Sequence, residues 1–268
     1  MTTRELLLSA WAPGIAVPLL CLLAIVLYAA RYRRRLQPRA AFHAAAVALF
    51  FVALASPIGV LARGYLFSAH MLQHLILVLA VPPLLLLGLP RQPDADPPRE
   101  GSAGVYIGSW LAGAAAMWIW HERTLCNAAA TVPAVQWLQT ITLLLMGFAF
   151  WRPILAPRDS DRLPPFQGIL YLFTSCVTCT VLGIMVTFSP VEVCNAYMHP
   201  VDSLGVLPLI RDGWGLSRRG DQELGGLMMW VPACFVYAAA ILATLSRYYQ
   251  GERPSLASAP ARGRRGGR

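Results

Sequence analysis

Seven apolar runs fill most of this 268-residue chain and limit what it can fold into. Each run is close to the roughly 20 residues that a helix needs to cross the hydrocarbon core of a bilayer. The runs are 11–30, 41–62, 69–89, 104–121, 134–151, 166–188 and 224–245. The sequence therefore predicts an all-α integral membrane protein, a bundle of seven transmembrane helices.

The composition favours one domain. Hydrophobic residues make up 57% of the chain and charged residues 13%. Because nearly all of residues 1–250 is used in crossing, we expect one transmembrane domain there and no soluble catalytic domain. No hydrolase, phosphate-binding or dinucleotide motif stands in the right context, so we expect no enzyme activity. Residues 251–268 are rich in Gly, Pro, Ser, Ala and Arg, which predicts a basic, disordered cytoplasmic tail.

The arginines predict how the bundle is oriented. Sixteen of the 22 basic residues, all arginine, fall in connections on one side, and six fall on the other. The positive-inside rule then places the N-terminus outside and the C-terminus in the cytoplasm. We read the net charge of +9 as a consequence of this topology, not as a nucleic-acid-binding surface. The expected location is a bacterial inner membrane.

Four of the five histidines fall at the outer end of this predicted bundle. His70 and His74 open the third span, and their four-residue spacing stacks both rings on one helix face. Polar side chains are costly inside a membrane segment and tend to mark function. His121 ends the fourth span, and His199 lies in the long external connection 189–223.

Sulfur ligands are expected near the same end. Met71, Cys126 and Cys194 join the histidines there. Imidazole, thioether and thiolate together suit copper, and Cu(I) prefers the softer members. A histidine at a span end also commonly serves only as a hydrogen-bonding or interfacial residue. Haem is a weaker alternative, because two rings on one helix face cannot straddle it.

The other polar residues of the spans have two interpretations each. Cys126 and Cys194 can form a disulfide in an oxidising compartment or supply thiolates to copper. Asp221 can cap the seventh helix or orient a ligating histidine. For Cys176 and Cys179, in the sixth span, helix packing is the better interpretation.

Glycine and proline predict three local features. Pro82-Pro83 should kink the third span or break its hydrogen-bond ladder. Gly225-Gly226 should allow a close helix approach. The proline-rich stretch 90–103 is typical of a flexible linker.

Several motifs together resemble one family. Residues 68–74, Ser-Ala-His-Met-Leu-Gln-His, precede Pro82-Pro83 and Gly88-Leu-Pro90. Further matching segments are Ser56-Pro57, which ends the second span, Trp120-His121, which ends the fourth, and the stretch from Asp221-Gln-Glu-Leu-Gly-Gly226 to Met229-Trp-Val-Pro232. This pattern resembles the CtaG-like cytochrome c oxidase assembly factors, which are seven-span membrane proteins. The resemblance runs from the second span to the seventh.

The resemblance implies a function in building a haem-copper oxidase. The chain would hold or deliver copper at the outer membrane face, or stabilise an apo-subunit, with oxidase subunits or other assembly factors as partners. The implied metal ligands are His70, His74 and His121, with possible auxiliaries Met71, Cys126, Cys194, His199 and Asp221. Family members commonly carry another histidine pair at the start of the fifth span, where this chain has Gln136 and Thr140.

Two other functions stay open from the sequence. A copper transporter would need ligands that continue across the membrane, and Cys176, Cys179 and Cys234 at mid-depth are the one indication of this. A haem- or quinone-binding membrane protein is the third possibility. A Soret band in the visible absorption spectrum of the purified protein would favour haem.

Overall fold

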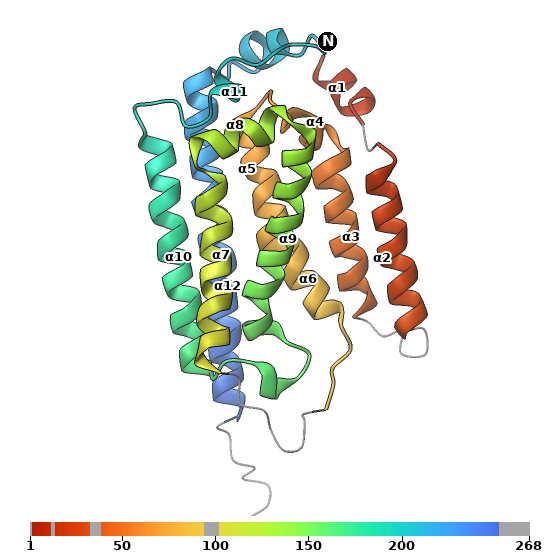
Figure 1. The fold of residues 1–268 in the computed structure, drawn as a ribbon, viewed down its shortest axis with the longest axis vertical. Coiled ribbons are helices and arrows are strands. Elements are labelled where there is room, and N and C mark those ends of the chain that lie inside the picture. Colours follow the sequence, from red (N-terminus) through yellow and green to blue (C-terminus); the bar gives the residue numbers. More distant parts are fainter. Residues whose placement is uncertain (1, 12–13, 33–38, 94–101, 252–268) are drawn as a thin grey trace, which may run out of the picture.

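Helices run side by side through the molecule (Figure 1). The structure, a computed structural model, describes residues 2–11, 14–32, 39–93 and 102–251. Within these ranges it contains helices and connections but no strand, which confirms the all-α class. The long elements are α2 (Ala16–Tyr32), α3 (Ala40–Ala55), α5 (Phe67–Leu75) with α6 (Val81–Gly88), α7 (Ala103–Trp120), α9 (Pro133–Leu155), α10 (Pro165–Phe188) and α12 (Arg218–Gly251).

Five segments are long and apolar enough to cross a membrane. They are Phe67–Gly88, Ala103–Trp120, Pro133–Leu155, Pro165–Phe188 and Arg218–Tyr249. The remaining two predicted spans correspond to α2 and α3, which are apolar but shorter, with 17 and 16 residues. The membrane character is therefore evident, while seven crossings and their orientation stay predictions. The predicted linker and tail fall largely on residues 94–101 and 252–268, outside the described residues.

The second apolar run is not one helix. α3 ends at Ala55, and a separate short helix α4 (Pro57–Leu61) follows. A residue before proline avoids the helical region, and Ser56 is extended, with φ −78° and ψ 176°. Its hydroxyl accepts the backbone N–H of Ile58 and so caps α4. The apolar run 41–62 thus contains two helices, because Ser56-Pro57 ends one helix and starts another.

Short helices gather at one end of the bundle (Figure 1). α1 (Thr3–Ser9), α4, α8 (Arg123–Thr131) and α11 (Asn195–Met198) lie there, near the N-terminus, and we call this the capped end. The last turn of α12 lies at the opposite end, which we call the C-terminal end. The predicted external connection 189–223 thus contains α11, the π-helical turn Leu209–Gly213, and the first residues of α12.

The double proline changes the helical hydrogen-bond pattern as predicted. α5 passes into a π-helical turn, Ile76–Ala80, before α6 begins. Pro82 has no N–H to give to the carbonyl of Val78 four residues earlier. The indole N–H of Trp151 on α9 donates to that carbonyl instead, at 3.0 Å, so the freed oxygen is satisfied.

The two glycines at the start of α12 allow close helix contacts, as predicted. A Cβ at Gly225 would collide with the ring of Phe67, and a Cβ at Gly226 would collide with the hydroxyl and backbone of Thr187. α12 thus lies directly against both α5 and α10.

Gly226→Ala should therefore destabilise the protein by about 2 kcal/mol, because overpacking at a rigid contact forces helices apart. Thermal unfolding in detergent measures this. Gly108→Ala, where the added Cβ meets nothing within 4 Å, is the control and should change little. An equal melting temperature for both variants would contradict the close contact.

Candidate metal site

α5 carries His70 and His74 into the interior at the capped end. Each side chain is only 1% exposed. The ring centroids are 4.3 Å apart, as the four-residue helical spacing predicts. Both histidines therefore face the protein core, away from lipid and water.

His121 joins this pair from α7. It is the C-cap residue of that helix, 8% exposed, and its ring centroid is 5.5 Å from that of His74. Its Nδ1 bonds to the carbonyl of Met117, which can only accept, so Nδ1 carries the hydrogen. The lone pair of Nε2 consequently points toward Met71 Sδ, 3.1 Å away.

The ring nitrogens of His70 and His74 have no hydrogen-bond partner among the described residues. Gln139 on α9 lies near His74, but the pair lacks hydrogen-bond geometry, and the Gln139 amide nitrogen is also without a partner. Buried polar atoms are nearly always satisfied, so this set of unused donors and acceptors needs an explanation. A metal ion that accepts the imidazole lone pairs provides one.

The donor set fits copper better than a harder metal. Three imidazoles and a thioether are ligands that suit Cu(I). Within the described residues, no group of three or more His, Cys, Asp or Glu side chains is already arranged to hold a metal ion. A bound ion would thus require the three rings to turn toward a common point.

Tyr197 forms one wall of the cluster. Its ring centroid lies 5.3 Å from that of His70, and its hydroxyl donates to the carbonyl of Ala62 at 2.7 Å. Burial raises the pKa of Tyr197, and Asp221 raises it further, so the phenol stays protonated. Tyr197 comes from α11, and no sequence motif pointed to it.

Asp221 positions the helix that carries the histidines. The N-cap residue of α5 is Leu66, whose side chain cannot accept a hydrogen bond. Asp221 of α12 accepts from the backbone N–H groups of Phe67 and Ser68, at 2.8 and 3.0 Å, and from the Ser68 hydroxyl at 2.6 Å. The carboxylate therefore caps α5 rather than α12 and holds the histidines through their backbone.

The neighbouring Gln222 fixes the loop beside the site. Its side-chain oxygen accepts from the Val193 N–H at 3.0 Å, and its amide donates to the carbonyl of Val191 at 3.2 Å. Asp221 and Gly225 thus join α12 to α5, Gln222 joins it to the loop after α10, and Gly226 joins it to α10. This explains why these residues stand together in the sequence.

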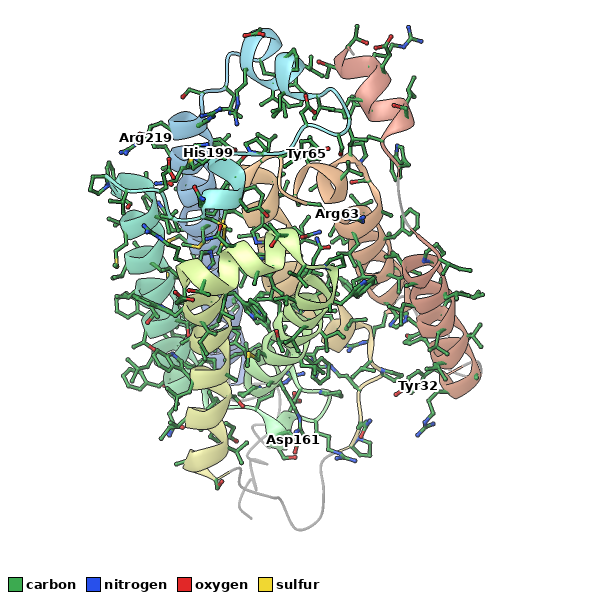
Figure 2. The ribbon with its side chains drawn as sticks, turned by 45° about the horizontal axis from the view of Figure 1, so that its top comes forward. Tyr32, Arg63, Tyr65, Asp161, His199 and Arg219 are labelled. Carbon is green, nitrogen blue, oxygen red and sulfur yellow. A yellow bond between two sulfur atoms is a disulfide. The ribbon has the colours of Figure 1, made fainter. Side chains whose placement is uncertain are left out.

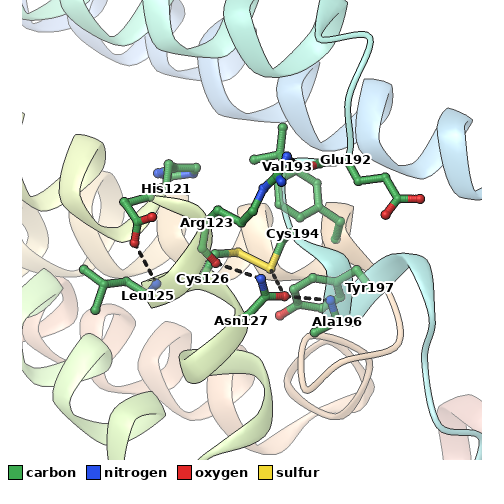
Figure 3. The surroundings of a disulfide bond; sticks show 12 residues. His121, Arg123, Leu125, Cys126, Asn127, Glu192, Val193, Cys194, Ala196 and Tyr197 are labelled. Atoms are coloured by element: carbon green, nitrogen blue, oxygen red, sulfur yellow. Dashed lines mark hydrogen bonds between the residues drawn. A yellow bond between two sulfur atoms is a disulfide. The ribbon is translucent and has the colours of Figure 1, made fainter.

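A disulfide links Cys126 of α8 to Cys194 just before α11 (Figure 3). The same two segments are joined by Asn127, whose side-chain oxygen accepts from the Ala196 N–H at 2.8 Å. Of the two sequence interpretations, the structure has the disulfide. In this state neither cysteine offers a thiolate, so the predicted role of both as auxiliary ligands is not available.

Removing the disulfide should destabilise the capped end. The bond closes a loop with a sequence separation of 68, for which chain entropy predicts a loss of about 4 kcal/mol. We expect Cys126→Ser with Cys194→Ser, or reductant alone, to lower the melting temperature in detergent. Reductant should leave the melting temperature of the double variant unchanged, and a further fall in that variant would mean that reduction acts elsewhere.

The other predicted auxiliary, His199, is not part of the cluster. Its side chain is 60% exposed and lies 3.8 Å from the Glu192 carboxylate. Figure 2 shows it at the surface of the capped end. The prediction that His199 helps to hold the metal has no geometric support.

Gln136 and Thr140, which stand where the family commonly has a second histidine pair, are also not part of the histidine cluster. The Thr140 hydroxyl donates to the carbonyl of Gln136 at 2.9 Å, and Thr140 lines a cavity of about 370 Å³ whose described walls include no histidine. Gln139, between them, is the residue of this stretch that lies near His74.

The intramembrane cysteines contact α12. Cys176 Sγ lies 3.3 Å from Cys234 Sγ, and Cys179 Sγ lies 3.5 Å from the carbonyl of Met229. Cys176 and Cys179 thus face a neighbouring helix, as the packing interpretation requires.

Together these features define an all-helical membrane protein with buried imidazoles and a thioether at one end of its bundle. The model of the family described as cytochrome c oxidase caa3 assembly factor, Caa3_CtaG, matches residues 23–251. The chain belongs to this family, which confirms the resemblance in its motifs. No curated protein and no solved structure gives a significant match.

Proposed function

We propose that this chain assists the assembly of a haem-copper cytochrome c oxidase by holding copper at its capped end. The ligands are His70, His74 and His121, with Met71 as a soft auxiliary. The observation that carries the proposal is the set of ring nitrogens of His70 and His74, buried without a hydrogen-bond partner. The alternative within the same family function is stabilisation of an apo-subunit by contact alone.

The charge of the site favours a monovalent ion. All four donors are neutral, so the charge of a bound ion stays uncompensated in a buried environment, and this costs more for a divalent ion. Cu(I) also prefers the thioether. A partner with thiolates can take the ion, because an anionic ligand binds it more strongly than a neutral one. No covalent bond of a substrate changes, so we assign no enzyme activity.

For the topology we propose seven crossings, with α2 and α3 as the first two, in a bacterial inner membrane. The capped end then faces outward and the C-terminal end faces the cytoplasm. Two observations support this orientation: the disulfide of the capped end needs an oxidising compartment, and the arginines concentrate in the opposite connections. Oxidase subunits or other assembly factors would meet the chain at the capped end.

Metal analysis of the purified protein and oxidase activity in a deletion strain together test the proposal. We expect about one copper per chain after loading with Cu(I) and restored oxidase activity on complementation. Restored activity without any copper binding would instead support stabilisation of an apo-subunit. Copper binding with no effect on the oxidase would refute the assembly function.

Copper transport is a second candidate because of the close pair Cys176 and Cys234. Cys234 lies further along α12 than Gly225, which contacts α5, and Cys176 of α10 lies beside it, so this pair could receive an ion from the histidines. Copper uptake into vesicles that contain the protein tests this. Uptake that disappears in Cys234→Ser would favour transport, and equal uptake with and without the protein would exclude it.

A further inference from the structure

A basic pocket lies at the C-terminal end of the bundle, opposite the end that holds His70, His74 and His121. Its volume is about 240 Å³. α6, the end of α9 with the segment after it, and the last turns of α12 form its walls. Four arginines line it: Arg39, Arg91, Arg162 and Arg247.

Among the described residues, one carboxylate pairs with these four arginines. Asp159 lies 3.3 Å from Arg91 and 2.7 Å from Arg162. Arg39 and Arg247 instead donate to neutral oxygens, the Leu89 carbonyl and the Thr244 hydroxyl. Arg39 and Arg247 therefore have no carboxylate partner in the described part of the chain, and Arg91 and Arg162 share one carboxylate.

The arginines are close enough to repel one another. Burial lowers the pKa of Arg162; Asp159 opposes this shift, and Arg247, Arg91 and Arg39 lower the pKa further. Like charges gathered at one pocket cost free energy unless an anion joins them. Arginine also matches phosphate geometry with two parallel hydrogen bonds, which makes these side chains suitable for a phosphate group.

The remaining walls are apolar. They consist of Leu86, Leu87, Ile154, Leu155, Ala240 and Ala243. α6 ends at Gly88 and α9 at Leu155, so the arginines stand where these apolar helices end. In a membrane, the ends of these helices lie at the depth of the lipid headgroups. Acyl chains would then lie beside the apolar walls.

We propose that this pocket binds the phosphate of an anionic phospholipid, with the four arginines around the headgroup and an acyl chain along the apolar walls. The apolar walls favour a lipid over free phosphate, which would leave them bare. Basic pockets between transmembrane helices are a known way to bind such headgroups. A bound lipid would connect α6, α9 and α12 at this end. The proposal is independent of copper and of the oxidase.

Lipid-dependent stability tests this. The purified full-length protein, stripped of lipid in neutral detergent, is titrated with phosphatidylglycerol, phosphatidylcholine or inorganic phosphate while its melting temperature is recorded. Phosphatidylglycerol should raise the melting temperature and phosphatidylcholine should not. An equal effect of both lipids would overturn the proposal, and so would an equal effect of phosphatidylglycerol and inorganic phosphate, which would indicate a free-anion site.

Arg39→Gln with Arg247→Gln should weaken the binding of phosphatidylglycerol about tenfold or more, because each arginine near an anionic headgroup contributes on the order of fivefold. Arg247→Lys keeps the charge and should lose less, which guards against a double variant that folds poorly. Arg152→Gln is the matched control, since Arg152 is 60% exposed, lies 3.9 Å from Asp161 and is outside the pocket. Asp161 marks this end in Figure 2. Unchanged binding in both Arg247 variants would refute the site.

The acidic residues Asp94, Asp96 and Glu100 offer an internal alternative. Replacing them with Asn, Asn and Gln distinguishes the two occupants. If the lipid occupies the pocket, the triple variant should bind phosphatidylglycerol as the unaltered protein does. Tighter binding by at least about tenfold would mean that this segment normally occupies the pocket, and the proposal would fail.

Discussion

His70→Leu with His74→Leu should abolish copper binding and lower oxidase activity in cells, while the protein still folds. This is the largest functional effect that we expect. The two imidazoles supply two of the four donors of the proposed site, and His121 with Met71 alone leaves too few. Copper content of the purified variant and oxidase activity in the complemented deletion strain measure the two effects.

Leucine, rather than alanine, separates a ligand role from a structural one. Neither ring donates or accepts a hydrogen bond in the described structure, so leucine removes no bond and fills most of the volume. We expect the melting temperature to stay the same or to rise. A rise would correspond to a gain of about 1 kcal/mol in the free energy of unfolding. A large fall in stability together with loss of copper would mean that the histidines hold the fold.

Two other histidines serve as matched controls. His199→Leu removes an exposed ring that pairs only with Glu192. His43→Leu removes a partly buried ring that lies 3.3 Å from the carbonyl of Ala24 and stacks on Tyr28. Both variants should keep copper and oxidase activity, and His43→Leu should lose some stability. Loss of copper in the His199 variant would show that the ligand set is wrong.

The predictable parts of the site were those with a local cause. The facing pair His70 and His74 follows from helical periodicity, which acts within four residues. The break at Pro82 follows from its missing N–H. His121 was expected near the pair because antiparallel crossings return alternate helix ends to the same side, and the ring distance of 5.5 Å to His74 agrees.

The remaining features depend on tertiary packing. Tyr197 reaches His70 through a loop folded over the capped end, and no periodic pattern describes that path. The pairing of Cys126 with Cys194 needed the positions of α8 and α11, so both oxidation states stayed open in the sequence. Ser56-Pro57 was visible as the motif that ends the second span, but the apolar run continues to residue 62, so the separate helix α4 was not expected.

Asp221 combines a local signal with a tertiary contact. Its substitution should have the largest effect on stability. Its position at the start of a helix suggested a local cap, yet its carboxylate caps α5, about 150 residues earlier in the chain. It is 1% exposed. Asp221→Ala leaves the N–H groups of Phe67 and Ser68 and the Ser68 hydroxyl without an acceptor. Lost capping and buried, unsatisfied donors should together cost about 3 kcal/mol.

Asp221→Asn should cost less, about 2 kcal/mol, because the amide oxygen can still accept a hydrogen bond. The remaining cost arises because the amide NH₂ faces another donor and because the favourable negative charge at the N-terminus of α5 is lost. Glu223→Gln is the control on the same helix. Its partner Arg219 is 2.7 Å away, but both are about half exposed, so the loss should stay below about 0.5 kcal/mol. Thermal unfolding in detergent ranks the three variants, and equal stability of Asp221→Ala and Glu223→Gln would contradict the cap.

Copper binding by the same variants shows whether Asp221 only positions the histidines or binds the metal itself. Because Asp221 acts on the backbone of α5, Asp221→Asn should weaken copper binding several-fold by displacing His70 and His74. The X-ray absorption spectrum of the bound copper should nevertheless stay that of nitrogen and sulfur ligands, since no carboxylate oxygen is lost from the metal. Loss of an oxygen ligand from that spectrum in Asp221→Asn would show that Asp221 binds copper directly.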